Sequence, residues 1–172
     1  MHDLVLVSGG VRSGKSAFAE SLLRHRYQES WLYWATGRAE DPEMEARIAA
    51  HRKLRPPGVR TLEQGFRDLL SSGRLENGGD LRESPLLLDS LGFCVLEILE
   101  EGCESWIERF SGVLSGRRAT TVIVTDEVGL GGISGSALGR RFADCIGFWN
   151  QRLAREATQV WTVMMGCPLR LR

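Results

Sequence analysis

The sequence predicts an α/β fold in which helices flank a mostly parallel central sheet. Short apolar runs alternate along the chain with segments of helical spacing. The apolar runs are nearly continuous, which is typical of strands covered on both faces. Alternating strands and helices favour parallel pairing through right-handed crossovers. A glycine-rich loop directly after the first run places a ligand site at one edge of this sheet.

Each expected element follows from the length and pattern of its segment. Runs too short for a helix predict strands at Leu4–Ser8, Trp31–Thr36, Pro85–Asp89, Thr120–Thr125 and Gln159–Met165. Helical spacing predicts helices at Lys15–Leu23, Asp41–Leu54, Glu63–Ser71, Leu91–Glu101, Trp106–Leu114 and Ala137–Glu156. The stretch Ser71–Ser84, which has no periodicity, is expected to be an exposed connection or a short disordered loop.

Composition and charge narrow the classes of function. The chain has 22 Lys and Arg and 22 Asp and Glu residues, so nothing in its charge favours nucleic acid or an anionic membrane. Hydrophobic residues make up 42% of the chain and charged residues 26%, which is ordinary for a globular protein and argues against disorder. We therefore expect residues 1–172 to form a single domain.

The start of the chain and its cysteines indicate a cytoplasmic protein. Apolar stretches such as Thr121–Val124 are far shorter than a membrane span. Met1 leads almost directly into the first strand, which leaves no room for a secretory signal. The cysteines never form a Cys-x-x-Cys pair, so a metal site is not indicated. We expect free, mostly buried thiols at Cys94, Cys103, Cys145 and Cys167.

The glycine-rich loop fits a phosphate-binding motif at every fixed position. It matches G-x-x-x-x-G-K-[ST], follows an expected strand and opens an expected helix. Its residues are Gly9, Gly10, Val11, Arg12, Ser13, Gly14, Lys15 and Ser16. Glycines let the backbone wrap a phosphate closely, and the helix presents its positive N-terminal end. The expected fold is therefore P-loop NTPase-like, and the domain is expected to bind nucleotides.

Two side chains of the loop carry its chemistry. Lys15 is expected to be catalytic because its positive charge lies beside the β- and γ-phosphates. The Ser16 hydroxyl is placed to ligate Mg²⁺. A carboxylate at a neighbouring strand end should complete the metal site. Asp89 closes one apolar run and has the cleaner pattern, while Asp126 and Glu127 close another. Whether Asp89 or Glu127 holds the metal stays open.

The loop identifies a phosphate ligand but not the reaction. A switch of the small-GTPase type would read guanine with Asn-Lys-x-Asp, and neither Asn77 nor Asn150 is followed by lysine. Kinases and nucleotidyl-transferring enzymes remain, together with nucleotide-binding regulatory proteins. The rest of the chain must decide between these classes.

Further motifs follow one pattern over essentially the whole chain. They are Gly9–Ser16 in its Gly-Gly-x-Arg-Ser-Gly-Lys-Ser form, Tyr33–Thr36, Asp41–Pro56, Thr61–Glu63, Leu88–Leu91, Glu127–Gly131, Asn150–Ala154 and Gly166–Leu169. Together they resemble the bifunctional adenosylcobinamide kinase/adenosylcobinamide-phosphate guanylyltransferase family of cobalamin biosynthesis. Asp41–Pro56 is the most specific part, because few other phosphate-loop families place a histidine-bearing helix directly after the second strand.

The resemblance implies an enzyme with two activities. The first phosphorylates the side-chain hydroxyl of adenosylcobinamide with ATP or GTP. The second transfers GMP from GTP to that phosphate, releasing pyrophosphate, and a histidine first carries the GMP. His51 matches that histidine. The resemblance further implies a corrinoid and nucleotides as substrates, Mg²⁺ as cofactor and a homo-oligomer.

The resemblance also assigns residues around the guanine nucleotide. The matching positions are Thr36, Gly37, Arg52, Arg55, Glu63 and Asp89. Each has a plainer interpretation, since Glu63 could be an ordinary acid near a helix N-terminus, and Arg52 and Arg55 could form a solvated face.

His51 also has a case of its own. On a helix over Asp41–Leu54, Glu43, Arg47 and His51 recur at four-residue intervals and share a polar face. A neutral imidazole can attack an α-phosphate to give a phosphoramidate, which splits one difficult displacement into two easier ones. The alternative is a surface histidine without a role.

The chain departs from the family pattern in two segments. In 92–95, Gly92–Val95 replaces a Thr-Leu-Trp-Leu-type run. In 126–135, Asp126 replaces an asparagine and Gly132–Gly135 replaces a later Ile-Val-Pro. Both segments lie outside the loop and the His51 helix, so we expect them to affect the corrinoid-facing surface more than the nucleotide chemistry. A regulatory nucleotide-binding protein and a simple small-molecule kinase that uses only the loop remain as alternatives.

Overall fold

The computed structural model describes residues 3–37, 42–72 and 81–172, and within these ranges the strands form one sheet of order β3-β2-β4-β5-β1-β6-β7. The strands are β1 (Leu4–Gly9), β2 (Leu32–Ala35), β3 (Arg60–Leu62), β4 (Leu86–Asp89), β5 (Thr121–Asp126), β6 (Gln159–Met164) and β7 (Cys167–Arg170). All neighbours pair in parallel except β6 and β7. The predicted mostly parallel sheet is confirmed, and β1 lies inside it between β5 and β6.

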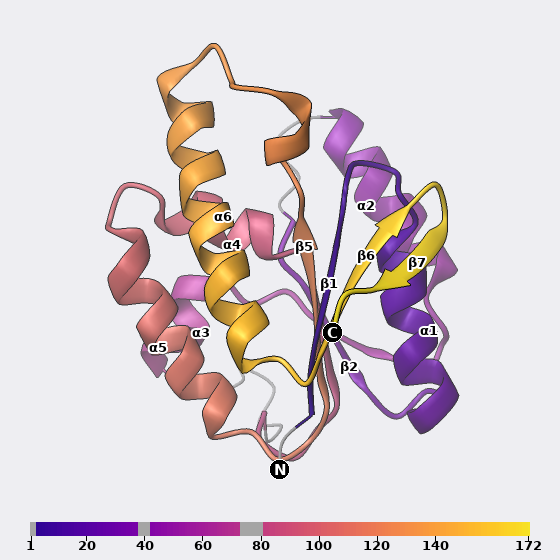
Figure 1. Cartoon of the computed structure of the whole chain (residues 1–172). Helices are drawn as coiled ribbons and strands as arrows, with labels where there is room; N and C mark the ends of the chain where they lie inside the picture. Colours follow the sequence, from indigo (N-terminus) through magenta and orange to yellow (C-terminus); the bar gives the residue numbers. More distant parts are fainter. Residues whose placement is uncertain (1–2, 38–41, 73–80) are drawn as a thin grey trace.

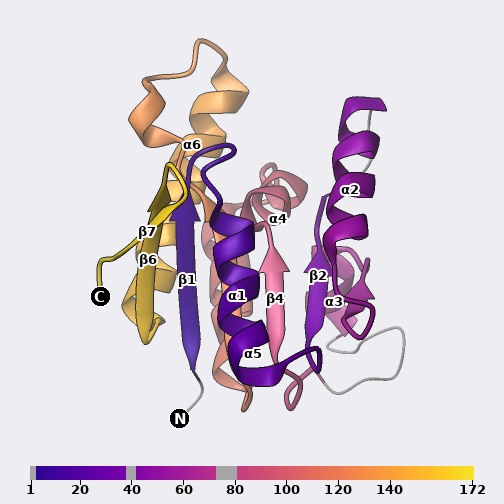
Figure 2. The ribbon, with the colours of Figure 1, turned by 90° about the vertical axis from the view of Figure 1, so that its right-hand side faces the viewer.

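Helices cover both faces of the sheet. They are α1 (Lys15–Tyr27), α2 (Pro42–Leu54), α3 (Phe66–Ser72), α4 (Leu91–Ile98), α5 (Cys103–Ser115) and α6 (Ala137–Glu156), with a short 3₁₀ turn at Gly129–Gly131. Figure 1 shows α1 on one side of the sheet and α4, α5 and α6 on the other. Figure 2 shows α2 near β2, towards the opposite end of the sheet from β6 and β7. Among the described helices, none has both the length and the apolar character that crossing a membrane requires.

The continuous apolar pattern of the strands is explained by two buried layers. On β1, Leu4 and Leu6 belong to the core formed with α3, α4, α5 and α6, whereas Val5 and Val7 belong to the core formed with α1. All four side chains are buried. Successive side chains of a strand point to opposite faces, so a strand between two helix layers needs apolar residues at every position.

The structure adds two strands that the sequence patterns did not predict. β3 has only 3 residues and pairs in parallel with β2. The whole of β7 is exposed at the sheet edge, and it returns antiparallel to β6 through Met165 and Gly166, both of which have positive φ. The predicted helix at Glu63–Ser71 begins only at Phe66. Asp41 and residues 73–80 lie outside the described residues.

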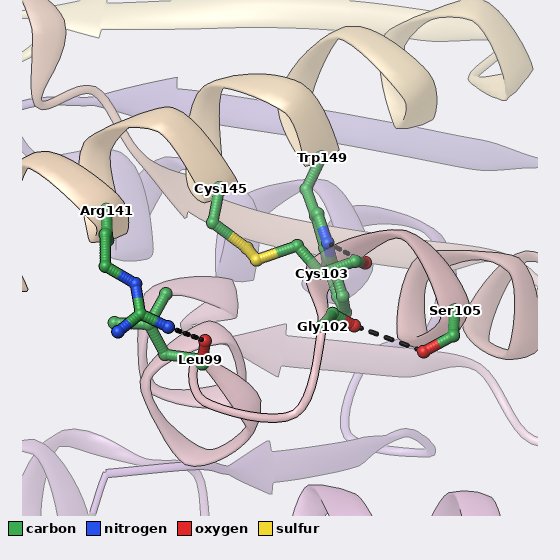
Figure 3. The surroundings of a disulfide bond; sticks show 7 residues. All are labelled: Leu99, Gly102, Cys103, Ser105, Arg141, Cys145 and Trp149. Carbon is green, nitrogen blue, oxygen red and sulfur yellow. Dashed lines mark hydrogen bonds between the residues drawn. A yellow bond between two sulfur atoms is a disulfide. The ribbon is translucent and has the colours of Figure 1, made fainter.

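The expectation of four free, mostly buried thiols is wrong. Cys103, the first residue of α5, forms a disulfide with Cys145 of α6, and their Cα atoms lie 5.9 Å apart (Figure 3). Cys94 is free and buried, but Cys167 is exposed. Nearby, Trp149 Nε1 donates to the Cys103 carbonyl at 2.9 Å. The two paired cysteines are 42 residues apart, so only the packing of α5 on α6 reveals the pair.

Candidate active site

The phosphate loop links β1 to α1 at the carboxyl edge of the sheet, as predicted. Gly9 has no room for a side chain, because a Cβ there would lie 2.7 Å from the Val163 carbonyl oxygen. Gly14 caps α1 with φ of 94°, a conformation that favours glycine. Gly166 N donates to the Ser13 carbonyl at 2.9 Å, which fixes the loop against the β6–β7 turn.

Lys15 begins α1 and points across the loop. Its Nζ donates to the Gly10 carbonyl at 3.1 Å and forms an ion pair with Asp126 Oδ1, also at 3.1 Å. Asp126 is the last residue of β5 and lies beside Gly9 in the register of β1 and β5. Ser90 Oγ donates to Asp126 Oδ2 at 3.1 Å. The loop lysine therefore already faces a carboxylate held at the neighbouring strand end.

A cavity of about 150 Å³ opens beside the loop and brings several predicted residues together. Lys15, Ser16, Gly37, Arg55 and Asp89 all line it. These residues come from α1, from the segment after β2, from the segment after α2 and from the end of β4. We call this space the phosphate cavity, because the lysine and the serine of the phosphate loop line it.

The Asp89 carboxylate is held by an aromatic neighbour. Tyr33 Oη donates to Asp89 Oδ2 at 2.6 Å. The Arg55 guanidinium carbon lies 3.7 Å from the centre of the Tyr33 ring, and Arg55 Nη1 donates to Thr61 Oγ1 at 3.1 Å. Burial, and after it the Asp89 carboxylate, raises the pKa of Tyr33 well above its usual range. The Tyr33 hydroxyl therefore remains a donor to Asp89.

A second cavity, of about 390 Å³, adjoins the first. Thr36, Gly37, Arg52 and Glu63, all predicted around the guanine nucleotide, line it. Arg52 Nη2 donates to Glu63 Oε1 in an exposed ion pair. The two cavities share Ala35, Gly37 and Ile48 in their walls. We call the second space the α2 cavity, because α2 forms one of its walls.

The histidine predicted to carry GMP lies on the helix of the α2 cavity. His51 directly precedes Arg52 on α2, which begins at Pro42 in the described residues. The side chains of His51 and Arg47 lie outside the described part of the structure, whereas Glu43 is exposed. The role of His51 stays a prediction.

The structure distinguishes Asp126 from Glu127, which the sequence offered together as carboxylates at one strand end. Asp126 reaches the phosphate cavity, whereas Glu127 accepts from the Gly129 N–H at 2.8 Å and is engaged with its own turn. A Cβ on Gly92 would overlap Asp126 Oδ2, so the two departures from the family pattern meet beside Lys15. One position from each departing segment therefore lies close to the loop lysine, while the expected larger effect on the corrinoid-facing surface stays a prediction. Both departures can be seen in the sequence, but only the fold shows that Gly92 and Asp126 lie side by side.

The donors at the phosphate cavity fit Mg²⁺. Ser16, Asp89 and Asp126 supply oxygen atoms to one space. The described residues contain no group of three or more His, Cys, Asp or Glu side chains that could enclose a metal. Mg²⁺ is usually held by one or two carboxylates together with substrate phosphates and water, and this site offers such a donor set.

Comparison with known proteins first supports the fold. One solved structure, an ATPase domain, superposes with a TM-score of 0.50 and 10% sequence identity, covering 93% of this chain and 68% of that chain. This likeness to an ATPase domain agrees with the predicted P-loop NTPase-like fold. At this identity it concerns the fold alone.

Sequence relatives cover almost the entire chain. The Escherichia coli K12 "Bifunctional adenosylcobalamin biosynthesis protein CobU" is 35% identical over 182 residues, spanning 98% of this chain and 99% of the relative. The Pseudomonas aeruginosa "Bifunctional adenosylcobalamin biosynthesis protein CobP" is 35% identical over 182 residues, spanning 100% of this chain and 98% of the relative. Residues 5–171 match the family description "Cobinamide kinase / cobinamide phosphate guanyltransferase". With its phosphate loop, its helix after the second strand and this match, the chain belongs to the cobinamide kinase / cobinamide phosphate guanyltransferase family.

Proposed function

We propose that this protein phosphorylates adenosylcobinamide with ATP or GTP and then transfers GMP from GTP to the product. The final products are adenosylcobinamide-GDP and pyrophosphate, and His51 carries the GMP between the two substrates. Family membership supports both activities. The observation that carries the proposal is that the phosphate cavity and the α2 cavity share a wall at Ala35, Gly37 and Ile48. A nucleotide held by the loop would thus lie next to the helix that bears His51.

The kinase step uses the loop. The loop backbone and Lys15 offset the charge that develops on the β- and γ-phosphates while the corrinoid hydroxyl oxygen bonds to the γ-phosphorus. The bond from that phosphorus to the leaving nucleoside diphosphate breaks, and the hydroxyl proton is released. Ser16, Asp89 and Asp126 are the residues that would hold Mg²⁺, which neutralises phosphate charge when bound. Tyr33 supports this step by orienting Asp89.

The transfer step uses α2. The neutral imidazole of His51 bonds to the α-phosphorus of GTP, and the bond between that phosphorus and the bridging oxygen of pyrophosphate breaks. A phosphate oxygen of adenosylcobinamide phosphate then attacks the same phosphorus and releases the imidazole. Arg52 lines the α2 cavity and Arg55 lines the phosphate cavity, and each guanidinium can donate two hydrogen bonds to phosphate oxygens. Glu63 holds Arg52 through the exposed ion pair.

Labelled GTP tests this proposal on the wild-type protein. GTP labelled at the α-phosphate should leave acid-labile label on the protein, and the label should map to a peptide that contains His51. GTP labelled at the γ-phosphate should leave no such label. Addition of adenosylcobinamide phosphate should then discharge the protein-bound GMP. Label on a peptide containing His25, which lies on α1, or an absence of label beside active kinase, would overturn the transfer mechanism.

A further inference from the structure

The charges that face the phosphate cavity balance one another before a nucleotide enters. Among the described residues that line it, Lys15 and Arg55 are cationic, and Asp89 and Asp126 are anionic. Asp89 accepts a hydrogen bond from Tyr33. Asp126 instead forms the ion pair with Lys15, at 3.1 Å. The lysine that the phosphates require is therefore already neutralised by a carboxylate of this chain.

Several contacts fix Asp126 in this position. It lies beside Gly9 in the sheet register, which places its carboxylate at the start of the loop. Ser90 Oγ donates to Oδ2, and Gly92 leaves the space that this oxygen fills. Asn150 Nδ2 donates to the backbone carbonyl of Asp126 at 3.2 Å, which ties the end of β5 to α6. The carboxylate is therefore held as part of the cavity wall.

A bound nucleotide changes this balance. Its phosphates bring several negative charges to Lys15, and the one ammonium group must then serve both the phosphates and Asp126. Two anions a few ångströms apart repel each other by about 1 kcal/mol in bulk water and by several times more near a protein surface. Asp126 would remain beside the phosphates, because Ser90 donates to its carboxylate, Asn150 holds its backbone and Gly92 leaves room for its side chain.

We propose that Asp126 makes nucleotide binding by this protein depend on a divalent cation. Without the cation, Asp126 competes with the phosphates for Lys15 and repels them. With the cation, the same carboxylate would be one of the residues that hold it, so its charge would favour nucleotide binding instead of opposing it. The inference rests on the proposed function in one respect, namely that the nucleotide phosphates occupy the phosphate cavity.

The test measures GDP binding by calorimetry in excess Mg²⁺ and in excess EDTA. GDP carries the β-phosphate and cannot donate GMP with release of pyrophosphate, so binding is separated from turnover. For the wild type, Mg²⁺ should strengthen GDP binding. Asp126→Asn keeps the shape and removes the charge, so GDP binding in EDTA should become about tenfold tighter, and the gain from Mg²⁺ should fall by a similar factor. Asp126→Ala should shift both quantities in the same direction.

Glu127→Gln is the matched control. It also removes one negative charge, at the residue next to Asp126, but the Glu127 side chain accepts from the Gly129 N–H instead. It should change the gain from Mg²⁺ much less than Asp126→Asn does. Thermal unfolding of each variant checks that the fold is kept. Unchanged or weaker GDP binding in EDTA for both Asp126 variants, or an equal effect of Glu127→Gln, would overturn the inference.

The outcomes also separate this inference from the proposed function. If GDP binding shows the expected dependence on Asp126 but GTP never labels His51, only the transfer mechanism fails. If His51 is labelled but the gain from Mg²⁺ does not depend on Asp126, only the present inference fails. If the wild type binds no GDP in either condition, the present inference fails, and the proposed function is judged by the labelling of His51 alone.

Discussion

The phosphate loop is held on both sides by buried structure, whereas α2 presents no buried side chain among those the structure describes. The loop follows β1, which lies between two parallel neighbours, and Gly166 N–H fixes it from a third side. On α2, Ile48 is half-buried, and the other described side chains, including Arg52, are exposed. The loop nevertheless lines the phosphate cavity, and α2 lines the adjoining α2 cavity and, through Ile48, the phosphate cavity as well.

This difference suggests a division of labour. A group that binds phosphates in every step benefits from a rigid frame, because its donors must be in place before the charge develops. A residue that carries GMP from one substrate to the other must meet two partners in turn, and an exposed helix leaves room for that. The comparison therefore predicts that changes in the loop affect both activities, and that changes on α2 affect only the transfer of GMP.

The largest effect is expected from Lys15→Ala. Because the ammonium offsets charge on the phosphates in both steps, each activity should lose about 3 kcal/mol of transition-state stabilisation, roughly a hundredfold in kcat. The measurement is a pair of steady-state assays, with circular dichroism to verify the fold. Lys53→Ala, on the exposed side of α2, is the control and should keep both activities. Near wild-type kinase activity in Lys15→Ala would contradict the assignment of the loop.

A smaller and more selective effect is expected from Arg52→Ala. Loss of a charge-assisted contact to the nucleotide phosphate costs about 1.5–3 kcal/mol, so GMP transfer should fall at least tenfold in kcat/KM. The kinase step should remain within a factor of about two, since Arg52 lines the α2 cavity and not the phosphate cavity. Arg52→Lys keeps the charge but not the paired donors and should recover only part of the loss. Equal losses of GMP transfer and kinase activity would contradict the proposed difference between the loop and α2.

The substitution Tyr33→Phe tests the boundary between the loop region and the α2 region more finely. Phe retains the ring under Arg55 but removes the hydrogen bond to Asp89. A hydrogen bond to a charged group contributes about 1.5–3 kcal/mol, so the free energy of unfolding should fall by about this amount. Urea unfolding gives this value, and the kinase assay should show a higher KM for the nucleotide. Unchanged stability together with unchanged KM would mean that Tyr33 does not position Asp89.

The smallest signal concerns the free thiols. Cys94 is buried on α4, and burial raises the pKa of its thiol above the usual range, so it should not react with a thiol reagent in the native protein. Cys167, exposed on β7, should react at once. Unfolding without reductant should release the second thiol, and reduction should add Cys103 and Cys145. Rapid reaction of Cys94 would show that the structure around α4, on the loop side of the site, opens locally.

The two regions also differ in how far the sequence predicted them. The position of the loop was predicted closely, with α1 beginning at Lys15 as expected and β1 ending one residue later than expected, because glycine spacing, a strand before it and a helix after it are local properties. The helix predicted at Asp41–Leu54 from its spacing is likewise present, from Pro42 to Leu54 in the described residues. The contact of Asp126 with Lys15 was not predicted, because it depends on the pairing of β1 with β5, which are more than a hundred residues apart.

The disulfide and the edge strand β7 were not predicted from the sequence, for related reasons. Cys103 and Cys145 have no local signal, and only the packing of α5 against α6 places them together. β7 has no buried residue that would mark it as a strand, and its pairing with β6 depends on the turn at Met165 and Gly166. Short-range patterns thus identified the loop and most of the elements, but not β3 or β7, while contacts between distant segments had to come from the structure.

The division of labour between the loop and α2 is tested most directly by His51→Ala, with His25→Ala as the matched histidine control. One assay follows α-labelled GTP onto the protein, and a second follows γ-labelled ATP or GTP into adenosylcobinamide. The account predicts that His51→Ala loses the protein-bound label and GMP transfer but keeps the kinase step, while His25→Ala keeps both. Protein-bound label that survives in His51→Ala, or loss of both activities in a folded variant, would contradict it.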